Sequence, residues 1–218
     1  LNGDPVPVGR VGSLHDPARP DPGEVFSDVT VAPAKVASDL IRKVKEADAV
    51  EGVPGGANTS LAEDQSRTLH VRGVCTLRDD GVKEIVQNLF QPIGSEFRYL
   101  SDEAPQFGGR GIAPDAATYM SAGIGFCFMT QFGRYAKIIK KNLDAYRIVQ
   151  DIHFSPGGAS GRTGRPGSAD AVETHVYLDS SEGIEFAETI LDMSEQTCFL
   201  HAFCRTDLKA KMRISALT

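Results

Sequence analysis

The amino-acid sequence predicts an α+β protein consisting of one domain and an N-terminal extension. Strand-like segments come in runs on both sides of a long apolar segment, residues 113–145, instead of alternating strictly with helices. The length of 218 residues suits one domain plus an extension, and 41% hydrophobic residues are enough to build a core. Because tryptophan is absent and only 7% of residues are aromatic, we expect this core to be mostly aliphatic.

The first 66 residues differ from the rest of the chain in composition and hydrophobic pattern. Residues 1–24 are rich in Pro, Gly and Asp, which is typical of an irregular arm. Residues 34–50 place apolar side chains on one face of a helix, so we expect a short amphipathic helix there, which "EGVPGGANTS" then ends. We therefore predict an N-terminal arm over residues 1–66 and the main domain over residues 67–218.

The domain begins with extended segments. The stretch "RTLHVRGVCTLRDDGVKEIVQNLF" holds two strand-like runs around a turn at "RDDG", and "SEFRYLS" adds a third run. The Gly- and Pro-rich segment 106–115 predicts a loop.

A long helix is predicted over residues 113–145. Pro114 suits the first turn of a helix, and Asp115 suits its positive N-terminal end. The middle of the segment, "GIGFCFMTQF", is apolar on all sides, which is typical of a helix buried within a domain or a dimer.

The second half repeats the pattern of strands and a helix. Segments 146–156 and 172–179 alternate like half-buried strands, and the Gly-rich segment 157–170 between them predicts a loop. Residues 182–198 predict a second helix, and "KAKMRISA" (209–216) predicts an edge strand.

Charge and composition exclude several classes of partner. The net charge of −6 argues against a nucleic-acid or anionic-membrane surface, which would need a basic face. No apolar run reaches the roughly 18–20 residues of a membrane span, so we expect a cytoplasmic protein without membrane contact. The four cysteines form no CxxC pair, which argues against a thioredoxin-type or zinc-ribbon site.

Cys127 lies inside the apolar helix and has two interpretations. Free cysteine is among the most buried residue types, so simple packing would explain it. Catalysis instead needs a thiolate, and a thiolate needs a positive partner such as an arginine, a histidine or helix-end amides. Because Cys127 lies too deep for the dipole of its own helix, a guanidinium would have to come from elsewhere. The candidates are Arg98, Arg110 and Arg72.

Cys198 lies at the predicted end of the second helix, where a side chain can move. Such a thiol suits a resolving cysteine, which attacks a sulfenic acid and forms a disulfide, but it also suits a structural role without chemistry. Cys204 could replace Cys198 as the resolving thiol. Cys75 lies in a strand-like run and is expected to pack.

The histidines predict neither a metal nor a cofactor site. His153 and His175 lie on predicted strands without a close pair of metal ligands, and His201 either tunes Cys198 or is a satisfied surface histidine. The segment "GGASGRTGRPG" lacks the ending of a phosphate-binding loop and leads into no helix.

Two longer stretches resemble a known family. "SDEAPQFGGRGIAPDAATYMSAGIGFCFMTQFGRYAKIIKKNL" resembles the central part of the OsmC/Ohr family of thiol peroxidases, in which a Gly-rich loop leads into a long helix that carries a cysteine. "VETHVYLD" and "EQTCFLHAFCRTDLKAKMRI" resemble the C-terminal half of that family, with its second cysteine. The similarity covers residues 67–218.

The resemblance implies a fold and an activity. The fold would be an intertwined homodimer with antiparallel sheets packed on long buried central helices. The activity would be reduction of organic hydroperoxides, with Cys127 peroxidatic, Cys198 resolving, and a dithiol such as a lipoyl group as reductant. Arg98 would stabilise the thiolate, and Asp115 stands where the family has a glutamate. Three apolar side chains near Cys127 would favour greasy peroxides over hydrogen peroxide: Phe126, Phe128 and Met129.

Two other functions remain open. A Cys/His hydrolase or transferase would pair Cys127 with His153, His175 or His201 within hydrogen-bond reach. A non-enzymatic dimeric module would bind an apolar ligand and leave its thiols inert. Two sulfurs within bonding reach favour the peroxidase, a Cys–His contact favours the hydrolase, and distant buried thiols favour the binding module.

Overall fold

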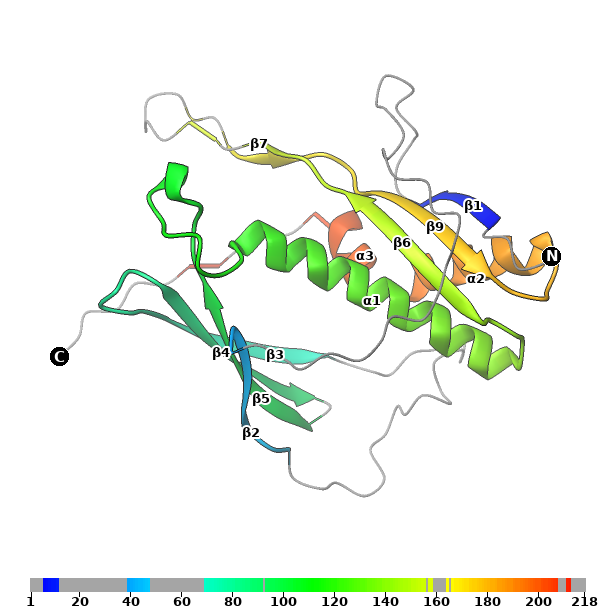
Figure 1. Ribbon diagram of the computed structural model, residues 1–218, viewed down its shortest axis with the longest axis horizontal. Coiled ribbons are helices and arrows are strands. Elements are labelled where there is room, and N and C mark those ends of the chain that lie inside the picture. Colours follow the sequence, from blue (N-terminus) through cyan, green and yellow to red (C-terminus); the bar gives the residue numbers. More distant parts are fainter. Residues whose placement is uncertain are drawn as a thin grey trace. The chain divides into compact units, whose positions relative to one another are not determined.

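A computed structural model gives the fold of the chain in two compact units, residues 31–122 and residues 1–30 with 123–218 (Figure 1). The structure describes residues 6–11, 39–47, 69–91, 93–155, 157–158, 164, 166–207 and 211–212.

The unit of residues 31–122 holds a four-stranded antiparallel sheet in the order β2-β5-β4-β3. Its strands are β2 (Ile41–Lys45), β3 (His70–Leu77), β4 (Lys83–Gln91) and β5 (Ile93–Ser101). Gly81, at a φ of 82°, and an Asp80 carboxylate that accepts the Val82 N–H form the turn between β3 and β4. The three predicted strands and the turn at "RDDG" are therefore confirmed.

A buried carboxylate organises the loop after β5. Asp102 is 3% exposed and accepts the backbone N–H groups of Glu103, Arg110 and Ile112. Burial opposes the charge, but these hydrogen bonds outweigh it and hold the pKa of Asp102 below its ordinary value. The predicted Gly/Pro loop is thus a defined structure, with one 3-10 turn at Pro105–Phe107.

The predicted long helix is α1 (Ala116–Ile139). It begins after Asp115, whose carboxylate accepts the Thr118 N–H at 2.7 Å, so Pro114 precedes the cap and does not lie in the first turn. It ends earlier than predicted because Lys140 adopts a left-handed conformation with a φ of 56°. One face is buried, whereas Phe126 is 69% exposed, so α1 is not buried all round within a single chain.

The other unit holds a three-stranded antiparallel sheet in the order β1-β9-β6 (Figure 1). Its strands are β1 (Val6–Val11), β6 (Ala145–Asp151) and β9 (Glu173–Asp179). Short strands β7 (Phe154–Ser155) and β8 (Ser168–Ala169) pair separately. Helices α2 (Ile184–Thr197) and α3 (Phe199–Arg205) follow β9.

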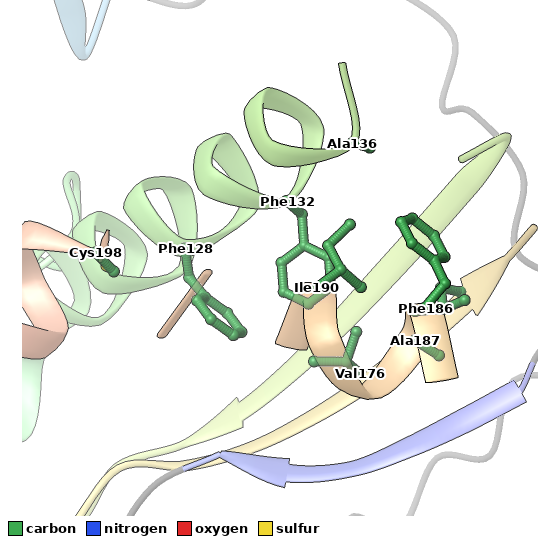
Figure 2. Packing of buried hydrophobic residues seen from close by; sticks show 9 residues of the cluster. Phe128, Phe132, Ala136, Val176, Phe186, Ala187, Ile190 and Cys198 are labelled. Atoms are coloured by element: carbon green, nitrogen blue, oxygen red, sulfur yellow. The ribbon is translucent and has the colours of Figure 1, made fainter. Parts of the chain in front are cut away.

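The core of this unit joins α1, α2 and β9. Phe132 of α1, Ile190 of α2 and Val176 of β9 come together, and each is at most 1% exposed (Figure 2). Phe128 packs edge-on against Phe132, with ring centroids 4.9 Å apart. Cys198 belongs to the same cluster, so the hydrophobic core holds the end of α2 against α1.

The fold class is confirmed as α+β with antiparallel sheets, but three predicted details differ. The helix predicted over 34–50 is wrong at Ile41–Lys45, which form β2 and pair with β5. Helix α3 was not predicted. The predicted edge strand 209–216 lies outside the described residues, except 211–212, which are not in a strand.

Most of the predicted loop 157–170 and of the arm 1–66 also lies outside the described residues, and the boundary at residue 67 stays a prediction. Across the described part of the chain, every helix is too short or too polar to cross a membrane.

Replacing Ile190 by Ala tests this core. Ile190 is fully buried, so we expect Ile190→Ala to lower the free energy of unfolding by about 2–5 kcal/mol in urea titrations. Ile184 lies on the same helix but is 51% exposed, so Ile184→Ala should change the free energy of unfolding by less than about 0.5 kcal/mol. Equal losses in the two variants would mean that α2 does not pack as described.

Candidate active site

The structure brings Cys127 and Cys198 together. Their side chains are hydrogen-bonded to each other, with Cys127 on α1 and Cys198 between α2 and α3. Cys198 is only 1% exposed, whereas Cys127 is partly buried. Two thiols in hydrogen-bond contact are the arrangement that a two-cysteine redox reaction requires.

Cys198 owes its position to the junction of two helices. It is the C-cap of α2 and the N-cap of α3, with extended φ and ψ angles of −78° and 119°. Its N–H donates to the Glu195 carbonyl at 3.3 Å, and its sulfur accepts the His201 N–H at 3.5 Å. A sulfur thus takes the capping role that oxygen side chains usually fill, and this contact turns the thiol inward.

Four neutral donors surround the Cys127 sulfur. The Cys198 thiol has the largest effect, and the backbone N–H groups of Leu200 and Phe199 and the Gln131 side chain add to it. Burial alone would favour the neutral thiol, but the donors outweigh it and lower the pKa of Cys127 from 9.0 to about 6. Cys127 is therefore mostly a thiolate at neutral pH.

Magnitudes show why a cation is not needed for this shift. The pKa of Cys127 is lowered because the hydrogen bonds to its thiolate outweigh the cost of burying the charge. Hydrogen bonds to a charged group are worth about 1.5–3 kcal/mol each, so a few of them overcome the desolvation cost. The expectation that a guanidinium must reach Cys127 considered only the amides of its own helix. It did not consider the amides at the start of α3.

The shared proton belongs to Cys198. The negative charge on Cys127 and burial both raise the pKa of Cys198. The more accessible sulfur thus carries the charge, and the buried sulfur keeps the proton. This division assigns different chemistry to the two cysteines: one is a ready nucleophile, and the other is a protonated neighbour.

Gln131 is a site residue that the sequence analysis missed. It is 5% exposed and lies four residues after Cys127, one helical turn further along α1. A polar side chain in the otherwise apolar run "GFCFMTQF" was the available signal.

His201 is buried and is not the surface histidine that was considered as one alternative. It is 4% exposed, and its ring packs on that of Phe128 with centroids 4.7 Å apart. Neither ring nitrogen has a hydrogen-bond partner among the residues that the structure describes. Burial lowers the pKa of His201, so the ring is neutral at pH 7. An unpaired buried polar group costs about 1–3 kcal/mol.

The candidate arginines belong to the unit of residues 31–122. Arg98 on β5 pairs with Glu84 at 3.5 Å and donates to the Asp39 carbonyl at 3.1 Å. Arg110 pairs with Asp80 at 3.0 Å, and Arg72 lies on β3. The role of Arg98 as a stabiliser of the thiolate stays a prediction.

The other candidate residues have different environments. Cys75 is exposed on β3, so the expectation that it packs is wrong, and Cys204 is exposed on α3. His175 lies on β9 and His153 lies between β6 and β7. No cluster of three potential metal ligands occurs in the described ranges.

The hydrolase hypothesis required a histidine within hydrogen-bond reach of Cys127. The hydrogen bonds that shift the pKa of Cys127 come from a cysteine, two backbone amides and a glutamine. They favour redox chemistry over a thiol–histidine pair.

The pKa of Cys127 can be measured directly. Ultraviolet absorbance of the thiolate, titrated in a Cys75→Ser/Cys204→Ser background, should show a transition near pH 6 that is absent in Cys127→Ser. Reactivity with iodoacetamide should fall as the pH drops through the same value. Cys198→Ala removes the largest favourable contribution and should raise the pKa more than Gln131→Leu does. A transition close to the ordinary cysteine value in the parent protein would contradict the described hydrogen bonds.

No protein-family model and no curated protein sequence matches the chain, but solved structures do. An OsmC-like hydroperoxide resistance protein from Jannaschia sp. is 18% identical, with a TM-score of 0.43 over 67% of this chain and 91% of that one. The organic hydroperoxide resistance protein OsmC from Legionella pneumophila is 12% identical, with a TM-score of 0.44 over 65% of this chain and 92% of that one. A third similar structure, from Vibrio cholerae, is 12% identical, with a TM-score of 0.43 over 68% of this chain and 91% of that one. All three of these solved structures are described as OsmC-like or organic hydroperoxide resistance proteins.

Proposed function

We propose that the chain is a cytoplasmic, cysteine-dependent peroxidase that reduces organic hydroperoxides. The observation that carries the proposal is the hydrogen-bonded pair of cysteines, with the charge on Cys127 and the proton on the buried Cys198. A thiolate of low pKa is the form that attacks peroxides, and a second thiol in reach prevents overoxidation.

The reaction has three steps. The Cys127 thiolate attacks the terminal peroxide oxygen, the O–O bond breaks, and the alkoxide takes a proton and leaves as an alcohol. This two-electron oxidation leaves a sulfenic acid on Cys127. The Cys198 sulfur then attacks the Cys127 sulfur, water leaves, and a disulfide forms. An external dithiol of the lipoyl type exchanges with this disulfide and restores both thiols.

Exposed aromatic side chains support a preference for apolar peroxides. Phe126, next to Cys127 in the sequence, is 69% exposed, and Phe199, next to Cys198, is 37% exposed. Phe203, one turn further along α3, is 44% exposed. Phe128 is fully buried in the core, so its expected contribution to substrate preference is not retained.

Thiol counting after peroxide treatment tests the proposal. With an equivalent of cumene hydroperoxide, the pre-reduced protein should lose both thiols of the pair, faster than with hydrogen peroxide. Cys127→Ser should lose neither of them, and Cys198→Ser should stop at a sulfenic acid on Cys127. Cys204→Ser is the matched control and should behave like the parent protein, because its thiol is exposed on α3.

Either of two results would refute the assignment. Equal thiol loss in Cys127→Ser and the parent protein would remove Cys127 from the reaction. A disulfide that persists in Cys198→Ser but disappears in Cys204→Ser would make Cys204 the resolving thiol.

The homodimer expected from the sequence is also part of the proposal. β3 is the terminal strand of its sheet, and Val71, Val74 and Leu77 on it are 50%, 60% and 71% exposed. Exposed apolar side chains on an edge strand are typical of an interaction surface.

Light scattering tests this assembly. We expect a particle of twice the 23.4 kDa chain mass, and Val74→Lys should shift it toward the monomer, because a charge on a buried interface strand is costly. Met212→Lys is the control, since Met212 is 90% exposed and should leave the mass unchanged. A monomeric parent protein at micromolar concentration would contradict the dimer.

A further inference from the structure

His201 is a buried base beside the cysteine pair that no step of the reaction has used so far. It is 4% exposed, and among the described residues both of its ring nitrogens lack a hydrogen-bond partner. A neutral imidazole carries one N–H donor and one free lone pair. Folded proteins rarely leave such a group unsatisfied, so packing alone does not account for it.

The position of His201 ties it to Cys198. It is the third residue of α3, and its backbone N–H donates to the Cys198 sulfur at 3.5 Å. A side chain at this position of a helix can fold back toward the capping residue, here Cys198, although the ring makes no hydrogen bond to that sulfur in the resting, reduced pair. Its ring packs on Phe128, which belongs to the same buried cluster as Cys198 (Figure 2).

Disulfide formation needs a base at this place. In the resting pair the Cys127 thiolate accepts the Cys198 proton in a hydrogen bond, but once Cys127 is a sulfenic acid that acceptor is lost. Cys198 is 1% exposed, so bulk water reaches its proton poorly. The α2 carboxylates nearest to it in the sequence are engaged elsewhere, Glu195 with Arg205 and Asp192 with Gln196.

We propose that His201 accepts the thiol proton of Cys198 as the disulfide forms and returns it to the departing hydroxide. This inference rests on the proposed function and deepens its second step. The Cys198 sulfur bonds to the Cys127 sulfur, the S–O bond of the sulfenic acid breaks, and the hydroxide takes the proton from the imidazolium. The products are the disulfide, one water molecule and a neutral His201.

A disulfide reagent tests this step without peroxide. In the Cys75→Ser/Cys204→Ser background, 5,5′-dithiobis(2-nitrobenzoate) should release its coloured thiolate in two phases. In the first phase Cys127 attacks the reagent and forms a mixed disulfide. In the second phase Cys198 attacks the mixed disulfide. The thiol proton of Cys198 must be removed in this phase, as in the reaction with the sulfenic acid.

Two substitutions of His201 should affect only the second phase. His201→Ala and His201→Gln should each slow it about 10²-fold, the scale of general-base catalysis, while an unchanged first phase shows that the Cys127 environment is intact. Imidazole added to His201→Ala should restore the second phase. Pyrazole, a ring of the same size that is a very weak base, should not. Ser194→Ala is the matched control, because Ser194 is also buried, one turn before Cys198, and its hydroxyl has no hydrogen-bond partner among the residues that the structure describes.

The outcomes separate this inference from the proposed function. A second phase that is unchanged in both His201 variants, or that pyrazole restores as well as imidazole does, would overturn the role of His201. If the second phase responds as expected but cumene hydroperoxide does not oxidise Cys127, only the peroxidase proposal fails. With the peroxide as oxidant, the His201 variants should accumulate a Cys127 sulfenic acid that dimedone traps, whereas the parent protein forms the disulfide.

Discussion

The hydrogen bond between the Cys127 and Cys198 side chains is the interaction on which the proposed chemistry of this protein depends. It makes the largest contribution to the lowered pKa of Cys127, and the charge that it stabilises raises the pKa of Cys198 in return. A single contact therefore makes one sulfur a nucleophile and keeps the other protonated in the core. Without the other cysteine, each thiol would lose the largest cause of its pKa shift.

This contact requires two helices to meet at one residue. Cys198 ends α2 and begins α3, and its extended backbone separates them. The first amides of α3 then donate to Cys127, so a short helix contributes more to the site than its length suggests. The core that joins Phe132, Ile190 and Val176 holds α2 against α1 and β9. This packing keeps the two cysteine side chains in contact. Stability and reactivity thus share the same packing.

The elements with strong hydrophobic periodicity could be predicted from the sequence. The elements that depend on strand pairing or on the backbone angles of one residue could not. The strands around "RDDG", the long helix and the helix before Cys198 follow from hydrophobic patterns and turn residues. Residues 41–45 fit an amphipathic helix equally well, but their pairing with β5 prevailed over helical propensity. Helix α3 was missed because its start depends on the backbone angles at Cys198, and no glycine or proline marks that break.

For the site, the sequence named both cysteines but not their surroundings. The search for a charged partner directed attention to arginines, whereas the donors are a thiol, backbone amides and Gln131. Every residue except proline has a backbone amide, so the amides that bind Cys127 cannot be identified from the sequence unless the start of α3 is known. His201 was recognised as a neighbour of Cys198, but only the fold reveals that its ring is buried and has no hydrogen-bond partner in the described part of the chain.

Competition among the four cysteines for a limiting amount of iodoacetamide, near neutral pH, tests the central claim most directly. Peptide mass spectrometry after a short reaction shows which thiol was alkylated first. Cys204 is exposed and Cys127 is partly buried, so accessibility alone favours Cys204. The account predicts Cys127 first, because its lowered pKa makes it mostly thiolate at that pH, and Cys198 last, because its pKa is raised. Labelling of Cys75 or Cys204 ahead of Cys127 would contradict it.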